Sequence, residues 1–183
     1  MIGSLFGIVE YINGNEIILN VNNVGYRVFL PRNWSLNLED KLKLFIHTHV
    51  KEDLLELYGF ELIEDLKLFE RLINISGIGP KTTLGIFQKG KRADILEAIE
   101  KEQVAFFTSV PRLGTKNAQK IIIELKGKLT DLSFDKNHAS DLVKALIDLG
   151  FKDFEIKNID KNIDKSLKLE TQLKQALKSL AKR

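Results

Sequence analysis

The sequence contains no cysteine, and only three histidines and one tryptophan occur among its 183 residues. The lack of cysteine excludes disulfides and thiolate metal sites and suits a reducing cytosol. The first residues, MIGSLFGIVEYINGNE, have no basic segment, and turn residues interrupt their apolar stretches. We therefore expect neither a signal peptide nor a membrane span, and a cytoplasmic location.

Two nucleotide-binding motifs are also missing. A Walker A loop occurs nowhere, and the glycines at 77 and 79 do not complete a dinucleotide fingerprint because the sixth position is Thr82. ATP hydrolysis by this chain alone is therefore not expected. His47 and His49 lack a third ligand nearby, so we interpret them as ordinary strand residues and expect no metal or other cofactor.

The composition that is present is that of a globular protein, 44% hydrophobic and 29% charged, with a net charge of +3. The charges are unevenly distributed. Residues 1–64 carry five Lys/Arg against nine Asp/Glu, residues 65–130 twelve against seven, and residues 131–183 eleven against nine. An acidic N-terminal segment and a basic central segment suggest separate modules, and a polyanion would bind the central one. Chance variation in a solvated surface gives the same pattern.

The hydrophobic pattern predicts an α+β protein of several domains. Residues 1–64 contain five short runs rich in β-branched and aromatic residues, among them EIILNV and LLELYGF, separated by turn signals such as Asn13-Gly14. This pattern predicts an OB-fold barrel, with a sandwich fragment as the alternative. Helical spacing begins after Glu61 and continues to residue 130. We expect a short linker at 131–138 and a small C-terminal three-helix bundle at 139–183.

The segment NISGIGPKTTLGIF, residues 74–87, predicts a tight glycine hairpin between two helices. Glycines at 77 and 79 allow a sharp turn, and Pro80 suits the first turn of the next helix. Free amides at that helix end form an anion site that contacts phosphate without reading bases. The proposed contacts are Gly77, Ile78, Gly79, Lys81 and Thr82. A plain helix–helix turn with an incidental lysine is the alternative.

A second copy of this pattern favours the phosphate interpretation. In TSVPRLGTKNAQKIII, Gly114 lies 35 positions after Gly79, and Lys116 corresponds to Lys81. Two hairpins in series could hold phosphates on both strands of a duplex. The proposed contacts of the second hairpin are Arg112, Leu113, Gly114, Lys116, Asn117 and Lys120.

With these motifs in this order, after a barrel that begins MIGSLFGIVE and ends KEDLLELYGF, the chain resembles the RuvA family over its whole length. These are the Holliday-junction-binding subunits of the bacterial branch-migration machine. The resemblance implies a homotetramer, or two tetramers on the DNA, built through the barrel. It also implies a non-catalytic subunit whose C-terminal domain contacts the RuvB ATPase and which cooperates with the RuvC resolvase.

Three features of the sequence remain distinctive. The resemblance places Glu52 and Asp53 at an acidic pin near the junction centre, whereas a charged solvated turn is the simpler interpretation. Arg112 stands where the family pattern has a glycine, which predicts a weakened or reshaped second hairpin, with a guanidinium that could itself contact phosphate. The linker is short for the family.

Three classes of function are compatible with these features. The first is structure-selective binding of four-way junctions, independent of sequence, together with a separate motor. The second is a nuclease or glycosylase that holds DNA with its hairpins, although Glu52 and Asp53 lack the supporting cluster of a two-metal site. The third is a protein-interaction adaptor with purely structural hairpins.

Overall fold

The computed structural model describes residues 1–31, 36–129, 146, 173, 174, 176 and 177. The chain divides into two units, Met1–Leu129 and Thr130–Arg183. The predicted linker and three-helix bundle lie outside the described residues, apart from five isolated helical positions that include the buried Leu146 and Ala176. The predicted domain limits at 64, 130 and 138 remain predictions.

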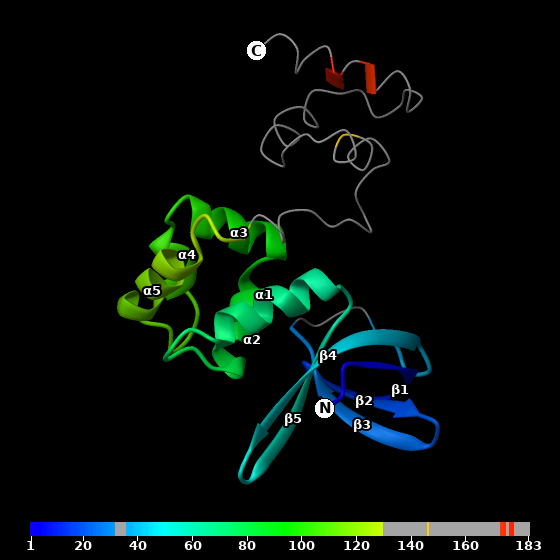
Figure 1. The fold of residues 1–183 in the computed structure, drawn as a ribbon. Coiled ribbons are helices and arrows are strands. Elements are labelled where there is room, and N and C mark those ends of the chain that lie inside the picture. Colours follow the sequence, from blue (N-terminus) through cyan, green and yellow to red (C-terminus); the bar gives the residue numbers. More distant parts are fainter. Residues whose placement is uncertain (32–35, 130–145, 147–172, 175, 178–183) are drawn as a thin grey trace. The chain divides into compact units, whose positions relative to one another are not determined.

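The first part of the chain forms a closed five-stranded barrel, which confirms the predicted barrel (Figure 1). Its strands follow the order β1-β2-β3-β5-β4 around the barrel. They are β1 Ser4–Asn13, β2 Glu16–Val21, β3 Val24–Phe29, β4 Lys41–Lys51 and β5 Leu54–Phe60. All neighbouring strands are antiparallel except β3 and β5, which pair in parallel at Val28↔Leu57 and Phe29↔Tyr58.

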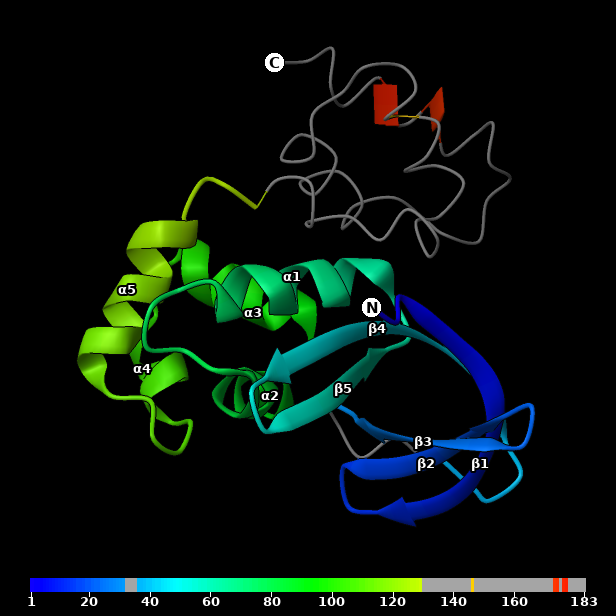
Figure 2. The same ribbon diagram turned by 60° about the horizontal axis from the view of Figure 1, so that its bottom comes forward.

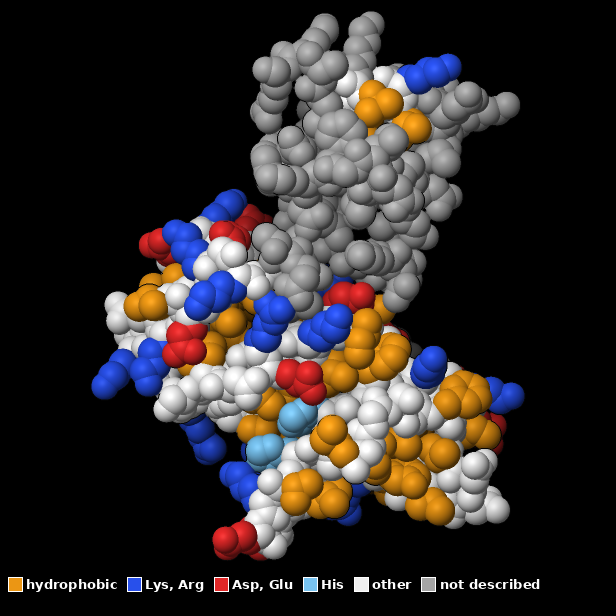
Figure 3. Space-filling model, in the orientation of Figure 1, with side chains coloured by type: hydrophobic (Ala, Val, Ile, Leu, Met, Phe, Trp, Pro, Cys, Tyr) orange, Lys and Arg blue, Asp and Glu red, His pale blue; other side chains and the backbone are white. Residues whose placement is uncertain are grey.

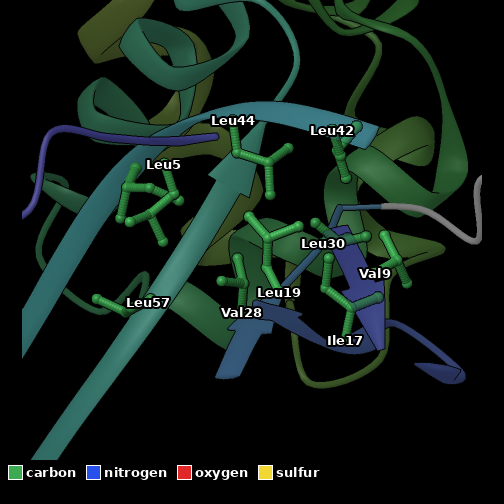
Figure 4. Packing of buried hydrophobic residues seen from close by; sticks show 10 residues of the cluster. Leu5, Val9, Ile17, Leu19, Val28, Leu30, Leu42, Leu44 and Leu57 are labelled. Atoms are coloured by element: carbon green, nitrogen blue, oxygen red, sulfur yellow. The ribbon is translucent and has the colours of Figure 1, made fainter. Parts of the chain in front are cut away.

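Alternation along the strands fills the barrel interior. Over Ser4–Val9 of β1 and Glu16–Leu19 of β2 every second residue is buried, and the apolar members of this set converge inside the barrel (Figure 4). Period-two alternation places such residues on one face of a strand, and closure of the barrel brings those faces together. The enclosed residues are Leu5, Val9, Ile17, Leu19, Val28, Leu30, Leu42, Leu44, Ile46 and Leu57.

The β4–β5 hairpin extends beyond the barrel wall. β1 pairs with β4 only over Lys41–Phe45, and β3 pairs with β5 only at two positions, whereas β4 and β5 continue to pair with each other out to Lys51↔Leu54. The far end of this hairpin therefore projects as a two-stranded arm, which is visible in Figure 1.

Within residues 61–129 five helices follow the barrel, as the helical spacing predicted. They are α1 Ile63–Ile73, α2 Pro80–Lys89, α3 Arg92–Glu100, α4 Val104–Thr108 and α5 Thr115–Leu125. α1 lies along β4 and β5, and Figures 1 and 2 show this packing from two sides.

An aromatic cluster joins the barrel to the helices. The ring of Phe69 in α1 lies 5.3 Å from that of Tyr58 and 5.0 Å from that of Phe60, and Phe60 in turn lies 5.6 Å from Phe87 in α2. All four side chains are almost completely buried. Tilted aromatic pairs at these separations add to the free energy of burial. The cluster therefore fixes α1 and α2 against β5.

Candidate nucleic-acid interface

Two helix–hairpin–helix elements repeat with the predicted offset of 35 residues. Hairpin 1, residues 74–79, joins α1 to α2, and hairpin 2, residues 109–114, joins α4 to α5. The amide of Ile78 donates to the carbonyl of Ile75 at 3.0 Å, and the amide of Leu113 donates to that of Val110 at 3.1 Å. The same correspondence holds for the bonds Thr83 to Gly79 and Ala118 to Gly114, both 3.0 Å. The sequence repeat is therefore a repeat of backbone geometry.

In each hairpin the residue directly before the glycine N-cap is apolar and faces the interior. Ile78 and Leu113 are both 3% exposed. Their amides are already used inside the turn, as described above. Their side chains pack in the interior and their amides close the turns, and the predicted phosphate contacts of both residues stay predictions.

Each hairpin leads into a helix whose first turn is not capped by a side chain. The N-cap residues are Gly79, with φ −99° and ψ 173°, and Gly114, with φ −79° and ψ 168°. Neither makes a side-chain cap bond, and neither first turn contains an acidic residue. A helix N-terminus without an internal acceptor presents its free N–H groups and the positive end of its dipole to an external anion.

The two glycine N-caps have open space where a side chain would stand. A Cβ added to Gly79 or to Gly114 would meet no atom within 4 Å, and both residues have negative φ. Neither packing nor backbone conformation therefore requires glycine at these two positions. Close approach of an external group would favour glycine here, because a side chain would stand in its path.

The predicted lysines stand at the same position in both helices but differ in their surroundings. Lys81 and Lys116 are each the second residue of their helix, and both are exposed. The Nζ atom of Lys81 lies 3.6 Å from the Oε1 atom of Glu56 in β5. For Lys116 no ion pair is found in the part of the chain that the structure describes.

Asn117 and Lys120 connect the two hairpins. The Nδ2 atom of Asn117 donates to the carbonyl of Gly77, and the Nζ atom of Lys120 donates to that of Ser76, both at 3.3 Å. Both were predicted as phosphate contacts of hairpin 2. In the structure they hold α5 against the turn of hairpin 1, which fixes the spacing of the two hairpins, and their contact with phosphate stays a prediction. The spacing of Asn117 and Lys120 along the sequence does not predict this contact with hairpin 1.

Arg112 adopts the backbone conformation of the glycine that it replaces. Its φ is +65°, and the corresponding Gly77 has φ +91°. Hairpin 2 therefore keeps the shape of hairpin 1 and is not reshaped. An L-residue in this left-handed region carries strain of about 1–2 kcal/mol.

We expect Arg112→Gly to raise the free energy of unfolding by up to about 1 kcal/mol, because the relieved strain is partly offset by the greater freedom of glycine in the unfolded chain. Chemical denaturation measures this change. Arg112→Gln is the matched control, since it removes the charge and keeps the strain. If the guanidinium contacts phosphate, both variants lose nucleic-acid affinity to a similar extent. Unchanged affinity in both would exclude that contact.

The predicted acidic pair lies at the end of the projecting arm. Glu52 and Asp53 form the turn between β4 and β5, and both are exposed. Figure 3 shows acidic side chains at this free end, at the lower left, and Lys and Arg side chains spread over the helical part. The pair is therefore well separated along the arm from the barrel core, and we call these two residues the acidic tip.

His47 and His49 lie on the face of the β4–β5 hairpin that meets α1. The Nδ1 atom of His47 lies 3.2 Å from Glu70 of α1, and the His47 ring lies 5.4 Å from that of Phe69. Burial, followed by the charges of Lys51 and His47, lowers the pKa of His49. Among the described residues no group of three or more His, Asp or Glu side chains is placed to hold a metal ion. Nor is any helix there long and apolar enough to cross a membrane.

Models of known protein families match both the barrel and the helical part of this chain. The family model of the RuvA N terminal domain matches residues 1–59, and that of the SAM-like helix-hairpin-helix tandem matches residues 69–128. Several curated relatives carry the name Holliday junction branch migration complex subunit RuvA. The protein of Halothermothrix orenii is 39% identical over 164 residues, which cover 86% of this chain and 84% of the relative. That of Oenococcus oeni is 36% identical over 168 residues, covering 85% and 86%. That of Fusobacterium nucleatum is 39% identical over 166 residues, covering 86% of each.

Proposed function

The chain belongs to the RuvA family, and from this premise we propose that it binds four-way DNA junctions through their shape and acts as the non-catalytic subunit of a branch-migration complex. The observation that carries the proposal is the pair of uncapped helix N-termini, built with the same hydrogen bonds 35 residues apart and held at a fixed spacing by Asn117 and Lys120. Backbone amides at helix ends contact phosphates and carry no sequence information. Such a surface supports binding that is independent of sequence.

The chain's role in migration is to hold the junction for a motor. It has no Walker A loop, so the energy for strand exchange comes from a separate ATPase, which we propose is RuvB. We propose that the region 139–183 makes this contact and that RuvC resolvase acts on the same junction. We also propose that the protein acts on DNA in the cytoplasm.

The assembly that we propose is a homotetramer, with two tetramers enclosing the junction as the larger form. A single protomer presents two hairpins, which suit one duplex arm. The homotetramer that the resemblance to the family implies would place one copy at each of four arms around a common axis. The acidic tips of the projecting arms would then meet near that axis, and the hairpins would hold the DNA arms farther out.

A gel-shift competition between a four-way junction and a linear duplex of the same base composition, with and without Mg²⁺, tests the function. We expect the junction to compete far better, with no dependence on its sequence. Affinity should fall with salt, with a log–log slope of about −0.9 for each phosphate neutralised. Equal affinity for both DNAs at matched salt would contradict the proposal.

The same gels distinguish the alternatives. A nuclease or glycosylase would leave cleaved or abasic strands on a denaturing gel, with or without Mg²⁺. An adaptor with structural hairpins would bind neither DNA. The curated names of the relatives favour the junction-binding function over both.

A further inference from the structure

A carboxylate from the barrel lies beside the lysine of hairpin 1. The Oε1 atom of Glu56 is 3.6 Å from the Nζ atom of Lys81, although the two residues belong to β5 and α2. The Glu56 side chain is only 11% exposed, whereas that of Lys81 is 79% exposed. The pair therefore joins a nearly buried anion to a cation that faces solvent.

Tyr58 holds this carboxylate in place. Its hydroxyl donates to the Oε2 atom of Glu56 at 2.5 Å. Burial, together with this hydrogen bond, raises the pKa of Tyr58 well above its usual value. Tyr58 itself is 1% exposed and packed against Phe69. Glu56 is thus anchored on one oxygen and offers the other to Lys81.

Among the described residues, the lysine of hairpin 2 has no such carboxylate beside it. Lys116 occupies the same place in α5 as Lys81 in α2, yet no carboxylate pairs with it among the residues that the structure describes. The two halves of the repeat share their backbone geometry and differ in the electrostatic state of their lysines.

We propose that Glu56 competes with DNA phosphate for the ammonium group of Lys81 and so lowers the affinity of hairpin 1 relative to hairpin 2. The inference rests on the proposed function of the hairpins. A phosphate that reaches the N-terminus of α2 needs the charge of Lys81, and a fixed carboxylate 3.6 Å from that ammonium neutralises part of it. A weaker first hairpin makes release of a DNA arm easier, which suits a protein that must let duplex arms slide.

The test is Glu56→Gln in the full chain, measured by fluorescence titration of a labelled four-way junction. Glutamine keeps an acceptor for Tyr58 and removes the charge. We expect the dissociation constant of the junction to fall by roughly two- to fivefold for each hairpin 1 whose lysine is released from Glu56. Exposed ion pairs contribute free energies in this range. Glu10→Gln on β1 is the matched control, because it makes the same change in net charge without contacting a hairpin lysine.

The gain must depend on Lys81. In a Lys81→Gln background, Glu56→Gln should act only as Glu10→Gln does, whereas in a Lys116→Gln background the full gain should remain. Unchanged or weaker binding of Glu56→Gln, or a gain that persists without Lys81, would overturn the inference. Wild-type protein that fails to prefer junctions would instead refute the proposed function.

A second measurement does not require Glu56 to be changed. Lys81→Gln alone should reduce affinity less than Lys116→Gln, because the charge of Lys81 is already partly neutralised. Both side chains are exposed, so neither substitution disturbs the core. An equal or larger loss at Lys81 would overturn the inference.

Discussion

Replacing Gly79 and Gly114 together by alanine should weaken junction binding by at least roughly a hundredfold, because each hairpin loses a charged hydrogen bond of about 1.5–3 kcal/mol. The added methyl groups meet no protein atom within 4 Å, and the φ angles of −99° and −79° suit any residue. They would stand in front of the helix amides, where we place the phosphate. Electrophoretic titration with a junction at fixed salt measures the loss.

The free energy of unfolding should hardly change when Gly79 and Gly114 are replaced by alanine. Alanine is a poorer N-cap than glycine, but it also reduces the entropy of the unfolded chain, and the two effects are each of order 1 kcal/mol and opposite in sign. Gly3→Ala is the matched control, since its Cβ also enters open space but lies on the barrel. If the folded double variant bound the junction as wild type does, the phosphates would lie elsewhere than at the two helix ends.

Replacing Glu52 by Gln and Asp53 by Asn should lower the preference for junctions over linear duplex by roughly tenfold, mainly through tighter binding of the duplex. A tenfold change corresponds to about 1.4 kcal/mol, and two like charges 4 Å apart in water repel by about 1 kcal/mol, so a few such contacts suffice. Both carboxylates are exposed at the end of the arm, where β4 and β5 pair only with each other beyond the barrel. In the proposed tetramer the four acidic tips would repel a continuous duplex that crosses the axis.

The control for the acidic tip is Glu10→Gln with Glu16→Gln, which removes two carboxylates from β1 and β2 and leaves the arm unchanged. Preference is measured as the ratio of the two dissociation constants over a salt series. A repulsive tip predicts that the difference between the variant and wild type shrinks as salt increases, because exposed charges are screened. Wild-type discrimination throughout the series would show that the tip is only a turn.

Local patterns in the sequence predicted the elements well. Two of the five strand runs, EIILNV and LLELYGF, correspond to β2 and β5 to the residue. The hairpin repeat and the strain at Arg112 were also predicted, because turn chemistry and left-handed backbone depend on residues only a few positions apart. Such short-range features are present in the sequence before any tertiary contact forms.

The tertiary structure alone decided how these elements meet. Nothing in the spacing indicated the parallel pairing of β3 with β5 or the projection of the arm beyond the barrel. The same holds for the hydrogen bond of Asn117 to the carbonyl of Gly77, 40 positions earlier. Glu56 and Lys81 lie 25 positions apart on different elements, and only closure of the barrel and the packing of Phe69 against Tyr58 bring them together. Long-range contacts follow from how whole faces pack, so a single sequence determines the hairpins themselves, while the folded chain determines which charges surround them.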